Sequence, residues 1–151
     1  MWLALATLAT ADYEAPQIWA VDGVSLAFSR TQLESSLGPA VSSRPLKASW
    51  GGERWEYTYR NGLKAAFVDQ DRGRHPSLLV GRHFTSRGLP MIALGQTRAQ
   101  VEARLGGAPT FSTAEHMVYE DPARRALLSL YFEDGRLREV VLSRFRIDSS
   151  R

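Results

Sequence analysis

One fifteen-residue pattern occurs twice in this chain, from Val24 to Gly38 and again 68 positions later, from Ile92 to Gly106. The two copies are identical at six positions, where chance would give about one match. The identical pairs are Leu26/Leu94, Arg30/Arg98, Gln32/Gln100, Glu34/Glu102, Leu37/Leu105 and Gly38/Gly106. A duplicated unit explains this agreement better than coincidence, so the pattern favours a fold built from two similar units.

Each copy predicts a short, capped helix. Ser29 is a typical N-cap residue, and Gln32 three positions later completes a capping box. Gly38 provides a left-handed stop after two helical turns. The corresponding residues of the second copy are Thr97, Gln100 and Gly106. Because so short a helix is unstable alone, we expect each one to pack on an apolar surface.

Alternating apolar and polar residues after each helix predict a three-stranded antiparallel meander. The expected strands are Trp55–Tyr59, Leu63–Val68 and Leu78–Arg82 in the first copy, and His116–Tyr119, Ala126–Phe132 and Leu137–Leu142 in the second. Arg60–Leu63 predicts a type I′ turn, and Asp134-Gly135 marks a second turn. Val24–Leu26 and Ile92–Leu94 could add a short strand before each helix.

The predicted fold class is therefore α+β, a tandem repeat in which a short helix or helix pair packs on a three- to four-stranded antiparallel meander. Repeat 1 is expected at residues 12–88 and repeat 2 at 89–151. Each repeat alone would have a marginal core, so we expect the two to pack together. Residues 1–11 are apolar and end in a small-x-small motif before Asp12, which predicts a signal peptide. The alternative is an N-terminal helix or strand of the mature fold.

The sequence offers few candidates for catalysis. It contains no cysteine, which excludes disulfides, thiolate nucleophiles and sulfur-ligated metals. None of the three histidines has a metal-binding partner at a known spacing, and no nucleophile elbow or nucleotide-binding glycine motif occurs. We therefore expect no enzyme activity, no metal and no cofactor. The alternative is an enzyme or small-ligand protein using the cleft between the repeats, with His83 or His116 beside an acid.

Aromatic residues of the first meander are the best candidates for partner binding. Alternation places Trp55, Tyr57 and Tyr59 on one strand face, and Trp50 lies just upstream. Large rings make good interface anchors where they are exposed. The alternative is that the helix covers this face and the rings form core. In the second copy, Tyr131 could likewise be an exposed ring or part of the core. It lies on the face opposite Leu128, Leu130 and Phe132, which we expect to be buried.

The net charge of +3 arises from nineteen basic and sixteen acidic residues, and the basic residues are almost all arginine. Arginines gather at Arg72–Arg74, at Arg82–Arg87 and toward the C-terminus. Such groups could bind nucleic-acid phosphates. Because acids interleave throughout and no known nucleic-acid motif is present, we expect a protein partner instead, and nucleic acid stays the alternative.

The segment Gly95–Gly106, which reads G-x-T-x-x-Q-V-x-x-x-L-G, and the W-x-Y of Trp55–Tyr57 resemble signatures of the SmpA/OmlA (BamE-like) domain. That family shares its helix-and-meander unit with the β-lactamase inhibitor protein fold, and with a domain that accompanies some secreted CAP proteins. The resemblance covers about residues 20–145 as two copies. Its matching residues are capping, core and turn positions, so it carries over no binding site.

The resemblance implies an exported, non-enzymatic protein-binding module of a bacterial cell envelope, periplasmic or extracellular, with an inhibitor-like or envelope-assembly-like role. Lipoproteins of this family carry their lipid on a cysteine. Since the chain contains no cysteine, no such lipid anchor is expected.

Overall fold

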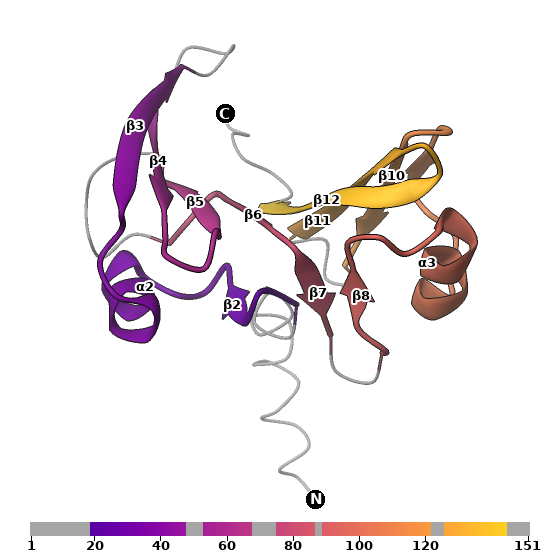
Figure 1. Cartoon of the computed structure of the whole chain (residues 1–151), viewed down its shortest axis with the longest axis horizontal. Helices are drawn as coiled ribbons and strands as arrows, with labels where there is room; N and C mark the ends of the chain where they lie inside the picture. The colour runs from indigo at the N-terminus through magenta and orange to yellow at the C-terminus, as the bar shows by residue number, and fades with distance from the viewer. Residues whose placement is uncertain (1–18, 48–52, 68–74, 87–88, 122–125, 145–151) are drawn as a thin grey trace, which may run out of the picture.

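A computed structural model describes residues 19–47, 53–67, 75–86, 89–121 and 126–144 (Figure 1). These ranges contain two helices, α2 (Arg30–Leu37) and α3 (Arg98–Leu105), and strands that form two antiparallel sheets. The class is α+β, as predicted. The strands are β1 (Ala20–Val21), β2 (Val24–Ser25), β3 (Ser42–Lys47), β4 (Glu53–Thr58), β5 (Lys64–Phe67), β6 (Leu78–Gly81), β7 (His83–Thr85), β8 (Ile92–Ala93), β9 (Phe111–Ser112), β10 (His116–Glu120), β11 (Ala126–Glu133) and β12 (Arg136–Arg144).

The larger sheet has eight strands in the order β3-β4-β5-β6-β12-β11-β10-β9. Strands β3 to β6 follow α2 in the chain, and β9 to β12 follow α3. The two groups meet at β6 and β12, where Leu79 pairs with Leu142 and Val80 with Val141. One continuous sheet therefore joins the two halves of the molecule.

A second, smaller sheet has the order β2-β1-β7-β8. Asp22 and Gly23 link β1 to β2 with positive φ angles of 53° and 84°, the conformation that Asp-Gly hairpin turns adopt. The Asp22 carboxylate accepts hydrogen bonds from the backbone N–H of Arg82 at 3.1 Å and of His83 at 2.9 Å. This carboxylate therefore fixes the start of β7 against β1.

Both helices have the predicted caps. Ser29 Oγ accepts from the Gln32 N–H at 3.1 Å, while the Gln32 side chain accepts from the Ser29 N–H at 2.7 Å. Thr97 and Gln100 form the same capping box, and Gly38 and Gly106 end the helices with φ of 84° and 79°. The local chemistry of the duplicated pattern is thus sufficient to place both helices.

The core lies between the eight-stranded sheet and the helices. α2 and α3 lie on one side of the sheet under its two ends, with β2, β7 and β8 between them (Figure 1). Leu33 of α2 and Val101 of α3 are fully buried. The predicted buried trio of β11 is confirmed, with Leu128 and Leu130 at 0% exposure and Phe132 at 5%. We call this side the helix-facing face and the opposite side of the sheet the open face.

Three features differ from the prediction. The four strands of each half agree with the predicted three to four, but the fourth is β3 or β9 at the outer edge of the sheet, a strand that was not predicted. The short strands before the helices form a separate sheet with β1 and β7. The Arg60–Leu63 turn is not type I′, because only Asp22 and Asp134 among described non-glycine residues have positive φ. Instead, Gly62 alone is left-handed, and the Asn61 side chain accepts from the Leu63 N–H.

The division into repeats at residues 12–88 and 89–151 stays a prediction. β7 lies before this boundary and β8 after it, although the two strands pair with each other. The signal peptide predicted at residues 1–11 lies outside the described residues.

Candidate functional site

The aromatic residues predicted on β4 lie against the core. Tyr57 is 7% exposed and Tyr59, just after the strand, is 1% exposed, while Trp55 is half-buried against the same cluster. Alternation along β4 places all three on the helix-facing face, which α2 covers. The exposed patch proposed for these rings is therefore wrong for Tyr57 and Tyr59. Trp50 lies outside the described residues.

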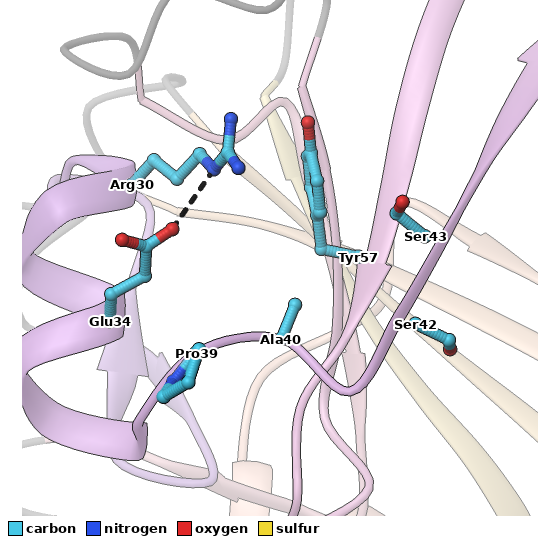
Figure 2. Close-up of a pocket in the computed structure, with 7 residues that line it drawn as sticks. All are labelled: Arg30, Glu34, Pro39, Ala40, Ser42, Ser43 and Tyr57. Atoms are coloured by element: carbon cyan, nitrogen blue, oxygen red, sulfur yellow. Dashed lines mark hydrogen bonds and ion pairs between the residues drawn. The ribbon is translucent and has the colours of Figure 1, made fainter.

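Tyr57 reaches a pocket of about 320 Å³ between α2 and the start of β3 (Figure 2). Arg30 lies over the tyrosine ring, with its guanidinium carbon 4.2 Å from the ring centre. The Arg30 Nε pairs with Glu34 one turn along the helix at 3.2 Å. Ser42 and Ser43 line the opposite wall. The pocket lies within the first half of the chain and has no histidine in its wall.

Tyr131 lies on the open face, where its ring belongs to a cluster of three. The His116 and Tyr131 rings are stacked, with centres 4.3 Å apart and planes at 9°. The Phe111 ring meets His116 edge-on at 5.4 Å. Phe111 is 49% exposed and Tyr131 is 37% exposed. We call these three residues the ring cluster.

Strand register assembles the ring cluster. β10 and β11 pair His116 directly with Tyr131, and β9 and β10 pair Phe111 with Val118. The three rings therefore come from three adjacent strands. The Nε2 atom of His116 is buried and has no hydrogen-bond partner in the described part of the chain. Sequence reasoning found Tyr131 but not Phe111 or the role of His116, since pairing across strands was needed to bring them together.

Helix α3 holds the outer strand of the cluster in place. Arg98 Nη2 donates to Ser112 Oγ at 2.5 Å, and its Nη1 donates to the Ala114 carbonyl at 3.2 Å. The same guanidinium pairs through Nε with Glu102 at 3.3 Å. One arginine thus connects the helix to the strand and turn that carry Phe111, so the exposed ring is held on an ordered support.

His83, one of the two histidines considered for a catalytic cleft, lies beside an aspartate that also holds the backbone in place. His83 Nδ1 lies 3.1 Å from Asp22 Oδ1, but the same carboxylate is also bonded to two backbone N–H groups. Within the described ranges, no group of three or more potential metal ligands occurs. This part of the chain also contains no helix long and apolar enough to cross a membrane.

Many described arginines are engaged within the fold. Arg30, Arg44, Arg98 and Arg138 pair with glutamates. Arg136 donates to the Gly95 carbonyl, and Arg144 donates to that of Leu26. Arg72–Arg74 and Arg87, which belong to the arginine groups that suggested nucleic-acid binding, lie outside the described residues, so nucleic acid stays the alternative.

No protein-family model matches the chain, and no curated protein sequence matches it either. Among solved structures, the chain is similar to a Streptococcus mutans protein described as a "putative beta-lactamase inhibitor protein". The alignment covers 90% of this chain and 98% of that one, with 16% identity and a TM-score of 0.32. A TM-score of this size does not establish a common fold, so the SmpA/OmlA resemblance stays a prediction.

Proposed function

We propose that this chain is a non-enzymatic protein-binding module that binds its partner through the open face of the eight-stranded sheet. The observation that carries the proposal is the ring cluster, with Phe111 and Tyr131 exposed on that face. Aromatic residues are enriched at protein interfaces, where burying one ring contributes far more than burying a small side chain. A partner that covered both rings would remove substantial apolar surface from water.

Stacking adds to the suitability of the ring cluster. Rings that already contact one another have fewer rotamers to lose on binding, which lowers the entropic cost of association. Arg98 further restricts the strand beneath Phe111. The ring cluster therefore meets two requirements of an interface anchor, exposed apolar area and a fixed geometry.

The module is proposed to be duplicated and exported. The duplication rests on the two matched helices, each capped in the same way and followed by four antiparallel strands. Export to the periplasm or the extracellular space rests on the apolar segment at residues 1–11 and on the SmpA/OmlA resemblance. Within this proposal, the role is inhibitor-like or envelope-assembly-like.

The test is affinity capture from fractionated extracts of the source organism, using tagged wild-type protein and a Phe111→Ser, Tyr131→Ser double variant. We expect a protein retained by the wild type, enriched from the envelope or secreted fraction, whose recovery falls at least about tenfold with the double variant. A tenfold loss corresponds to about 1.4 kcal/mol, within the range of aromatic interface anchors.

Leu94→Ser provides the matched control, because Leu94 is 39% exposed but follows β8, away from the open face. Circular dichroism must first establish that all variants are folded. Equal recovery by wild type and double variant would contradict the open face as the binding site. Enrichment only from the cytosolic fraction would contradict the proposed export.

A further inference from the structure

The two helices begin with the same arginine, but the terminal nitrogens of the two side chains have different surroundings. In the second half, Arg98 directs its Nη atoms to Ser112 Oγ and to the Ala114 carbonyl, two oxygens of its own chain. In the first half, Arg30 uses its Nε for Glu34, as Arg98 does for Glu102. Its Nη atoms form no hydrogen bond with any described residue.

The space beside Arg30 is open. Its guanidinium lines the 320 Å³ pocket between α2 and β3 (Figure 2) and lies against the Tyr57 ring. The arginine side chain is only 15% exposed, so its position is set by these contacts rather than by solvent. Ser42 and Ser43 of β3 form the other wall. The Arg30 Nη atoms thus border the pocket without a hydrogen-bond acceptor from any described residue.

Charge decides what kind of acceptor fits. Glu34 lines the same pocket and pairs with Arg30, so an incoming carboxylate or phosphate would lie close to a second negative charge. Arg98 accommodates two uncharged oxygens while paired with Glu102. A neutral acceptor, such as a hydroxyl or a peptide carbonyl, is therefore favoured over an anion.

We propose that the Arg30 pocket binds an uncharged peptide turn of a protein partner, in which a serine or threonine hydroxyl and a nearby main-chain carbonyl accept from the Arg30 Nη atoms. The contacts of Arg98 with Ser112 and Ala114, in the second half of the same chain, have this geometry. The inference rests on the proposed protein-binding function for the source of the peptide. The pocket adjoins the helix-facing residue Tyr57 rather than the ring cluster, so either site can fail without the other.

The test is a titration of ¹⁵N-labelled protein with N-acetyl-Ser-Thr-Ala-amide, the sequence of residues 112–114, followed by NMR of backbone amides and arginine side chains. We expect a saturable shift of the Arg30 side-chain signals and of the Ser43 amide, with a Kd in the millimolar range for so small a probe. Ring-cluster signals should not move. No saturable shift at several tens of millimolar peptide would overturn the proposal.

Two variants and one competing ligand sharpen the result. Ser43→Tyr fills the pocket while keeping the Arg30–Glu34 pair, and it should abolish the shift. Ser36→Tyr makes the same replacement at an exposed serine outside the pocket and should leave the shift unchanged. An undiminished shift in Ser43→Tyr would overturn the proposal. Acetate binding more tightly than the peptide at the Arg30 signals would overturn the preference for a neutral acceptor.

Discussion

At the scale of single residues, the least expected feature is a pair of buried tyrosine hydroxyls. Those of Tyr59 and Tyr119 have no hydrogen-bond partner in the described part of the chain. Burial raises the pKa of Tyr59 from its ordinary 10.0 to about 12, and the charge of Glu34 adds to the shift. Burial and the charge of Glu102 also raise the pKa of Tyr119. Both phenols therefore favour the neutral form in the folded state.

Tyr59→Phe should alter stability in a pH-dependent way. At neutral pH the variant should be as stable as the wild type or more so by up to about 1 kcal/mol, because it removes a buried hydroxyl that lacks a partner. Above pH 10 the unfolded tyrosine loses its proton first, so the wild type should lose stability as the pH rises toward 12. The Tyr59 contribution to this loss is about 2 to 3 kcal/mol, and the variant should lack it. Urea unfolding at several pH values measures the difference.

Tyr119→Phe serves as the companion variant, since the pKa of Tyr119 is raised for the same reason. It should also reduce the alkaline loss, and the double variant should reduce it further. Parallel alkaline profiles for the wild type and Tyr59→Phe would contradict the assignment of the loss to this residue.

Residue alternation correctly grouped Trp55, Tyr57 and Tyr59 on one face, but it could not predict which face the helix covers. Which face of β4 the helix covers depends on the path of the chain between α2 and β4, and β3 lies on this path. The sequence of β3 gave no signal of a strand, because Pro45 interrupts it and its residues do not alternate. Tyr131 was placed correctly because its neighbours Leu130 and Phe132 are unambiguous core residues.

At the scale of elements, the two helices are nearly equivalent. Each has eight residues, a capping box and a final glycine, and one fully buried side chain anchors each helix, Leu33 or Val101. Helices of two turns have little intrinsic stability, so their caps and their packing carry most of it. The N-cap hydroxyls are therefore the most direct point at which to perturb one half and then the other.

Ser29→Ala and Thr97→Ala should each lower the free energy of unfolding by about 1 kcal/mol, because each leaves an orphan N–H at the start of its helix. The helices lie under opposite ends of the sheet (Figure 1), so the two effects should add within about 0.5 kcal/mol. Urea denaturation gives these values, and hydrogen exchange shows which helix frays.

Ser36→Ala is the matched control, because Ser36 is exposed near the end of α2 and caps nothing. It should change stability by less than about 0.5 kcal/mol. A Ser29→Ala cost equal to that of the control would mean that the capping box contributes nothing to α2.

Local signals predicted these elements unevenly. The Asp134-Gly135 turn was found because long alternating strands flank it. Asp22-Gly23 has the same dipeptide and the same positive φ angles, yet its flanking strands have two residues each, too few to show alternation. The small sheet was therefore missed as a sheet. Its pairing of β1 with β7 joins segments about 60 residues apart, which no local pattern specifies.

At the scale of the whole molecule, the two sheets approach closely at Gly81, where β6 ends. A Cβ atom at this position would lie 2.5 Å from Val21 Cγ1 and 2.5 Å from Asp22 Oδ2. Val21 is fully buried, and the Asp22 carboxylate is bonded to the backbone of β7, so neither can move freely. Gly81 is thus required for contact between the sheets.

Gly81→Ala should destabilise the protein by about 1 to 3 kcal/mol through overpacking. Thermal and urea unfolding measure this loss, and amides near Asp22 should exchange faster. Gly107→Ala is the control, because a Cβ there would meet nothing within 4 Å and no positive φ is involved. A Gly81→Ala protein as stable as this control would contradict the close approach of the two sheets.

The junction between β6 and β12 has a consequence for how the protein is made. β12 follows every other described element in the chain, yet it supplies the neighbour that completes the sheet of the first half. Arg144, at the end of β12, also donates to the carbonyls of Leu26 and Pro76. While the ribosome is still adding residues 136–144, β6 in the half synthesised first lacks its neighbour β12 and has an unpaired edge. The eight-stranded sheet can therefore be completed only after residues 136–144 have been synthesised.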